Sequence, residues 1–151
     1  MANRIESKLT PALFDELLNE RFVQVASIDH ETGGPMISAL SWVHAKDEST
    51  ILFAVDKRSR IIANISRHPL VALNIIANET CYSISGNAQT TGSSSDKVPI
   101  ELAIVQLAIK EVRDIMFYGA KIVEEPKFDK TYDQEAAMKL DAQVMNELKK
   151  H

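Results

Sequence analysis

The sequence predicts a mainly β fold with flanking helices: an antiparallel split or closed barrel carrying an N-terminal and a C-terminal helix. Short apolar runs rich in β-branched residues recur along the chain, and turn residues separate them. The connections are short, as antiparallel neighbours require. Gly86 interrupts one run, which is typical of the bends at barrel corners. We count six or seven strands and expect residues 1–151 to form a single domain.

Composition excludes several classes of protein. With 45% hydrophobic residues, 25% charged residues and a formal charge of −4, the chain lacks the basic excess of a nucleic-acid surface. No apolar stretch approaches the length of a membrane span, and the first residues lack the apolar core of a signal peptide. The lone Cys81 cannot form an intramolecular disulfide. These observations predict a cytoplasmic protein.

The first 44 residues predict a helix and a β-hairpin. Thr10-Pro11 combines an N-cap with proline at the first helical position, and the helix should reach about Arg21. Residues 22–28 carry a period-two strand pattern, and residues 29–34 supply turn chemistry. The returning strand is expected to run from Met36 to about His44.

The centre of the chain predicts two buried strands joined through a short helix. The strands are the apolar runs at 51–55 and 70–76. Ser59 is the expected N-cap of the helix, which continues to Arg67 before His68-Pro69 ends it.

Three cations, Lys57, Arg58 and Arg60, surround the start of this helix. Free N–H groups and the positive end of the helix dipole already favour an anion there, so the cluster indicates a phosphate site. A solvated turn with no ligand is the alternative, and the pattern leaves both open.

The remaining residues predict three strands, a loop and the last helix. Residues 102–109 fit helix or strand by periodicity, and the β-branched residues favour a strand over about 103–116. The expected order is a strand at 81–88, a low-complexity surface loop at 90–97, a strand at about 103–116, a short strand at 120–125 halted by Pro126, and a helix at 133–149.

Part of the sequence resembles a known family. Gly34-Pro35, the run 57–60 and the run 63–73 look like the pyridoxamine 5′-phosphate oxidase-like, flavin-binding split-barrel family. The resemblance extends from about residue 10 to residue 90, and residues 113–119 look similar to small bacterial members.

The resemblance implies FMN bound at the interface of a homodimer, with its phosphate held by basic side chains and its ring along barrel strands. In three positions, Ile61, Ser38 and Val43, this chain departs from basic residues of the oxidase enzymes. The implied cofactor contacts are Ser38, Ala39, Leu40, Ser41, Trp42, Val43, Ala54, Val55, Lys57, Arg58, Ser59 and Arg60.

The function implied is that of an FMN-dependent oxidoreductase acting on an unidentified small substrate or nicotinamide donor. The alternatives are a flavin-binding or stress-response module without turnover, and a haem-binding relative on the same barrel that would use His44. The four histidines show no metal-ligand spacing. No acid–base pair or nucleophile stands out in the sequence, so the catalytic residues are left unassigned.

Overall fold

A computed structural model describes residues 4–151, which form eight strands and three helices. The strands are β1 Ile5–Glu6, β2 Val23–Ile28, β3 Pro35–Leu40, β4 Val43–Asp47, β5 Thr50–Asp56, β6 Leu70–Ala77, β7 Thr80–Ser93 and β8 Leu102–Asp114. The helices are α1 Pro11–Glu16, α2 Arg60–Arg67 and α3 Gln134–Lys150.

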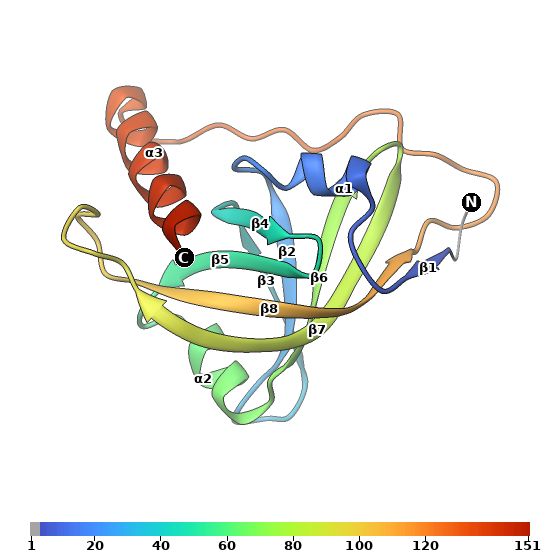
Figure 1. The fold of residues 1–151 in the computed structure, drawn as a ribbon, viewed down its shortest axis with the longest axis horizontal. Helices are drawn as coiled ribbons and strands as arrows, with labels where there is room; N and C mark the ends of the chain where they lie inside the picture. Colours follow the sequence, from blue (N-terminus) through green and yellow to red (C-terminus); the bar gives the residue numbers. More distant parts are fainter. Residues whose placement is uncertain (1–3) are drawn as a thin grey trace.

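The strands pair antiparallel in the order β3-β2-β6-β7-β8-β5-β4, and β1 adds to β8. The sheet curls without closing, because β3 and β4 stand at its two ends. In Figure 1 the long strands β7 and β8 curve across the lower half of the molecule, with α2 beneath them and α3 at the upper left. The expected antiparallel split barrel is confirmed.

Two apolar clusters share strand β5. Because strand side chains alternate between faces, Ile51 and Phe53 enter the main core inside the curled sheet, whereas Leu52 and Ala54 face the second cluster beneath α3. α3 contributes Val144 and Leu148 to that second cluster. This two-sided burial explains why residues 51–55 read as an unbroken apolar run.

The glycine in β7 marks an irregularity, as predicted. The register between β7 and β8 shifts between Ser85 and Gly86. A Cβ at Gly86 would lie 2.0 Å from the carbonyl oxygen of Ala108, so only glycine allows the two strands to approach this closely.

The predicted strand from Met36 to His44 is wrong as one element. It divides into β3 and β4 at Ser41 and Trp42, because the Ser41 carbonyl accepts hydrogen bonds from the amides of Val43 (3.0 Å) and Arg21 (3.1 Å). The chain therefore changes neighbours: β3 pairs with β2, and β4 pairs with β5.

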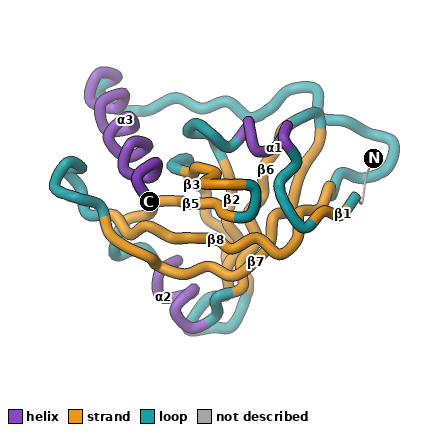
Figure 2. Tube along the Cα trace, viewed as in Figure 1, coloured by secondary structure: helices purple, strands orange, loops and turns teal. Residues whose placement is uncertain are grey.

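The short strand expected at 120–125 is also wrong. These residues lie in a long irregular segment, 115–133, which Figure 2 shows crossing from the end of β8 to α3. The amide of Ile122 donates a hydrogen bond to the carbonyl of Glu79 at 2.8 Å, but residues 120–125, all of which the structure describes, form no strand. Val123, an apolar residue within this stretch, is 83% exposed.

Two boundaries differ from the prediction. α1 ends at Glu16, short of Arg21, because the carbonyl of Leu17 accepts a hydrogen bond from Ala45 of β4 instead of continuing the helix. β7 continues to Ser93, so the loop shrinks to residues 94–101.

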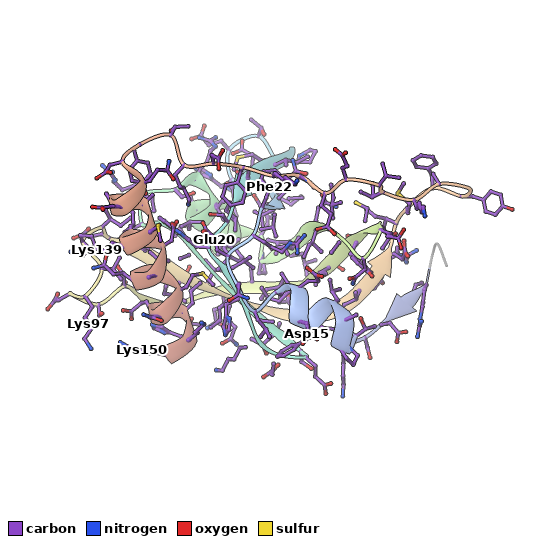
Figure 3. All side chains as sticks on the ribbon, turned by 90° about the horizontal axis from the view of Figure 1, so that it is seen from above. Asp15, Glu20, Phe22, Lys97, Lys139 and Lys150 are labelled. Carbon is purple, nitrogen blue, oxygen red and sulfur yellow. The ribbon has the colours of Figure 1, made fainter. Side chains whose placement is uncertain are left out.

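The shortened loop packs beside α3. Ser95 donates a hydrogen bond to Glu147 at 2.6 Å, and Val98 is buried in the α3 cluster. Figure 3 accordingly shows Lys97 at the same end of the molecule as Lys150. Over residues 4–151, no helix combines the length and the apolar character that crossing a membrane requires.

Candidate functional site

The predicted anion site begins at the start of α2, where Ser59 is confirmed as the N-cap. Its hydroxyl oxygen accepts a hydrogen bond from the amide of Ile61 at 3.2 Å, and its carbonyl accepts one from the amide of Ile62 at 3.0 Å. Two of the amides that the sequence offered to a ligand are thus already capped within the helix.

Arg60 points back to the turn that joins β2 and β3. Its Nε donates a hydrogen bond to Asp29 Oδ1 at 2.7 Å, and its Nη2 lies 3.4 Å from Glu31 Oε2. The Asp29 side chain is 9% exposed, whereas that of Arg60 is 44% exposed. The guanidinium is therefore fixed on one side and open to solvent on the other.

Asp29 is held on both carboxylate oxygens. Oδ2 accepts hydrogen bonds from the hydroxyl (2.8 Å) and the amide (3.0 Å) of Thr32, while Oδ1 accepts the one from Arg60. The hydrogen bond from Arg60, followed by that from the Thr32 hydroxyl, holds the pKa of Asp29 far below its ordinary value. The carboxylate stays charged throughout the neutral pH range.

The two other cations of the cluster are exposed. Arg58 donates to Asp56 through its amide at 2.7 Å and through Nε at 3.3 Å, and these bonds lower the pKa of Asp56. No side-chain partner for Lys57 is found among residues 4–151. The carboxylates of Asp29, Glu31 and Asp56 thus offset much of the positive charge that the sequence pattern indicated.

A polar network fixes α2 against the β2–β3 hairpin. Asn64 is fully buried. Its side-chain oxygen accepts a hydrogen bond from the backbone amide of His30 at 2.9 Å and lies 2.8 Å from the Nδ1 of the same histidine. Its nitrogen donates to Ser27 at 3.0 Å and lies 3.6 Å from the sulfur of Met36 on β3. This contact places Met36 of β3 beside the middle of α2, and Ser38 lies two residues further along the same half-buried face of β3.

The predicted contacts on β3 stay accessible. Ser38 and Leu40 are half-buried, and Ala39 is exposed. β3 is an end strand of the sheet and pairs with β2 alone, so one edge of its backbone is unpaired within the described residues. We refer to β3 and residues 57–60 jointly as the α2–β3 site.

Ser41 and Trp42 are bound to other parts of the chain. Ser41 donates a hydrogen bond to Glu20 at 2.5 Å, and the Trp42 indole donates one to Asp141 of α3 at 3.0 Å. Lys130 bridges Glu20 (2.8 Å) and Asp141 (3.0 Å), with its ammonium 5.7 Å from the centre of a Trp42 ring. These side chains hold the C-terminal segment in place.

The remaining predicted contacts have little free side-chain surface. Val43 is fully buried in the main core, and Val55 is 8% exposed. Ala54 is 2% exposed beneath α3, and its amide bonds to the Trp42 carbonyl at 3.0 Å. Any contact from these three residues would be through the backbone.

Sequence reasoning missed the carboxylates of the β2–β3 turn and the buried Asn64. Asp29 and Glu31 were assigned to turn chemistry alone, although two acids in a turn adjoining a strand of the expected site could have indicated a partner for Arg60. Asn64 carried no signal beyond its place in a motif. Lys130 and Asp141 contact Trp42 across 88 and 99 residues, a separation that local patterns do not reveal.

His44, the histidine relevant to haem, lies half-buried on β4. Its Nδ1 is 3.3 Å from the Leu18 carbonyl, and burial lowers its pKa. Among residues 4–151, no three His, Cys, Asp or Glu side chains gather in a way that could hold a metal ion.

Comparison with known proteins decides the family. The family model described as pyridoxamine 5′-phosphate oxidase matches residues 9–116, which is more than half of the chain. The chain belongs to the pyridoxamine 5′-phosphate oxidase family. The matched region includes strands β2 to β8 and the α2–β3 site, and it ends before α3. No curated protein matches the sequence.

Solved structures show the fold that this pyridoxamine 5′-phosphate oxidase-family chain shares. A proposed pyridoxamine 5′-phosphate oxidase from Lactobacillus delbrueckii is 22% identical, with a TM-score of 0.60 over 74% of this chain and 98% of its own. HupZ from Group A Streptococcus is 15% identical, with a TM-score of 0.60 over 75% and 98%. A haem-binding protein from Mycobacterium smegmatis is 14% identical, with a TM-score of 0.53 over 72% and 53%. At these identities the likeness concerns the fold alone.

Proposed function

We propose that this member of the pyridoxamine 5′-phosphate oxidase family binds FMN in the α2–β3 site as an FMN-dependent oxidoreductase. The observation that carries the proposal is Arg60, whose guanidinium is anchored through Nε and exposed on its other side. A fixed, half-exposed guanidinium is planar and can donate parallel hydrogen bonds to two oxygens of a phosphate group. Lys57 adds an exposed cation three residues before it.

The residues present fit the rest of the cofactor less closely. The unpaired edge of β3 at Ser38 and Ala39 offers backbone groups to the polar edge of a flavin ring. Ala54 is buried beneath α3 and offers no free side-chain surface, whereas Trp42 is half-buried with its indole nitrogen bound to Asp141 of α3. The proposed site therefore rests on β3 and residues 57–60.

When bound, FMN supplies hydride and electron transfer. The chain's own contribution is to position the cofactor: Arg60 binds the phosphate, Asp29 orients Arg60, and Ser59 caps the helix. The hydrogen bond between the Nδ1 of the neighbouring His30 and the side-chain oxygen of Asn64 fixes the orientation of the imidazole. Donor and substrate are left unassigned.

A titration of flavin fluorescence tests the proposal. FMN should saturate near one molecule per chain, and Arg60→Ala should weaken FMN binding by about tenfold or more, because it removes a charge-assisted contact to phosphate. Riboflavin, which lacks the phosphate, should bind both proteins alike. Arg4→Ala is the matched control, since Arg4 is an exposed arginine that pairs with an acidic residue on β1.

Wild-type protein that binds neither flavin would overturn the proposal, and equal affinities of Arg60→Ala and wild type for FMN would remove Arg60 from it. Bleaching of bound FMN by NADPH and recovery in air would support an oxidoreductase. Bound flavin that no donor reduces would indicate the module without turnover. A Soret band lost in His44→Ala would support haem instead.

The proposal includes a homodimer with FMN at its interface. The face formed by β2, β3 and β6 exposes Ile37 (68%) and Leu70 (60%), and a groove of about 350 Å³ lies between Ile28, Pro35 and Ala72. A two-fold partner would cover this apolar surface. Sedimentation of the FMN-loaded protein as a monomer would contradict the dimer.

We also propose that residues 1–151 form one domain and that the protein is cytoplasmic. The shared strand β5 joins the two apolar clusters, which supports one folding unit. The single Cys81 fits a reducing compartment.

A further inference from the structure

The nitrogens of Arg60 are used unequally. Nε makes a 2.7 Å hydrogen bond to the nearly buried Asp29, whereas Nη2 is 3.4 Å from Glu31. No partner for Nη1 is found among residues 4–151. A ligand phosphate can approach only the Nη side, because the Nε side is occupied.

Glu31 differs from Asp29 in what holds it. Its side chain is 67% exposed, and its two oxygens lie 3.4 Å from Arg60 and 3.5 Å from His30. Neither distance reaches that of a strong charge-assisted hydrogen bond. Asp29, by contrast, is held at 3.0 Å or less on both oxygens. One carboxylate is fixed, and the other can move away at little cost.

We infer that Glu31 is a specificity-determining residue that competes with the ligand phosphate for the Nη groups of Arg60, while Asp29 is a positioning residue. The inference rests on the proposed function. A phosphate monoester carries close to two negative charges at neutral pH and displaces the single charge of Glu31. A flavin without phosphate cannot displace it. Glu31 thereby lowers the affinity for FMN. It also restricts binding at Arg60 to ligands whose negative charge is large enough to displace the Glu31 carboxylate.

The experiment compares FMN and riboflavin on wild type, Glu31→Gln and Glu48→Gln by fluorescence titration at low ionic strength. Glu31→Gln should tighten FMN binding by about three- to tenfold, because competition and charge repulsion are both relieved. Riboflavin affinity should stay within about twofold of wild type, on the same reasoning. Glu48 is the matched control: it is 60% exposed, pairs with Lys8 at 3.1 Å, and its replacement changes the net charge equally.

The outcomes separate the inference from the proposed function. FMN binding that is unchanged or weaker in Glu31→Gln would overturn the inference alone. The same holds if Glu31→Gln tightens the binding of FMN and riboflavin equally, or if Glu48→Gln tightens FMN binding as much as Glu31→Gln does. Wild-type and Glu31→Gln proteins that bind no flavin would overturn both. Raising the salt concentration should reduce the difference between wild type and Glu31→Gln, because screening weakens both effects.

Discussion

The turn between β2 and β3 depends on one carboxylate. Asp29 joins Thr32, three residues further along the turn, to Arg60 on α2, so the same side chain shapes the turn and fixes the arginine. Because its hydrogen-bond partners act on the charged form, the folded state binds a proton at Asp29 less readily than the unfolded chain does.

Replacing Asp29 with asparagine should lower the free energy of unfolding at neutral pH. A depressed pKa contributes stability that is present above the unfolded value of 3.8 and is lost as the pH falls toward the folded value. The difference between wild type and Asp29→Asn should therefore be constant from about pH 5 to 7 and shrink below about pH 4. Urea unfolding across this pH range measures it.

Asp96→Asn, which removes one carboxylate from the exposed loop after β7, is the matched control. A wild-type–variant difference that grows on acidification would contradict the assigned sign.

At the scale of elements, β7 and β8 form the longest hairpin and bend together at Gly86. The bend lets one pair of strands contact β6 on one side and β5 on the other. Packing at the bend is between backbones, which cannot move aside as a flexible side chain can.

Gly86→Ala should lower the free energy of unfolding by about 2–4 kcal/mol, since the added Cβ would lie 2.0 Å from the Ala108 carbonyl oxygen. Gly34→Ala is the control, because a Cβ there meets nothing nearer than 3.4 Å, and it should change stability by no more than about 0.5 kcal/mol. Denaturant unfolding compares the two variants. Equal free energies of unfolding for Gly86→Ala and Gly34→Ala would show that β7 and β8 can move apart without loss of stability.

On the scale of the whole molecule, segment 115–133 and α3 lie beyond almost all of the region that the family model matches. Lys130 joins this C-terminal part to the rest of the fold through Glu20, and it joins segment 115–133 to α3 through Asp141. Burial acts to lower its pKa, but the two carboxylates outweigh it, and the pKa of Lys130 is raised. Lys130 is therefore charged when the segment is docked.

Lys130→Ala should lower the free energy of unfolding by about 1–2 kcal/mol, because it leaves two half-buried carboxylates without their common partner. Lys127→Ala removes an exposed lysine from the same segment and should have an effect within about 0.5 kcal/mol. Urea unfolding of both variants decides. A Lys127→Ala effect as large as that of Lys130→Ala would show that the segment's general charge, not the Lys130 contacts, holds it.

Local patterns predicted most of the sheet but not its interruptions. Periodicity and capping are local properties, so the sequence predicted the strands at 51–55 and 70–76 and the N-cap at Ser59. The break at Ser41 and Trp42 was not, since it arises from hydrogen bonds to Arg21 and Ala54 across the fold. For the same reason the cations at 57–60 were visible in the sequence, whereas the carboxylates that neutralise Arg60 were hidden in a distant turn.

The contact between Trp42 and α3 gives the protein an internal optical reporter. Trp42 is the single tryptophan of the chain, and it touches both Lys130 and Asp141. Its emission spectrum should therefore change when the C-terminal segment departs and exposes the indole. Excitation at the red edge of indole absorption would follow that departure without contributions from the three tyrosines.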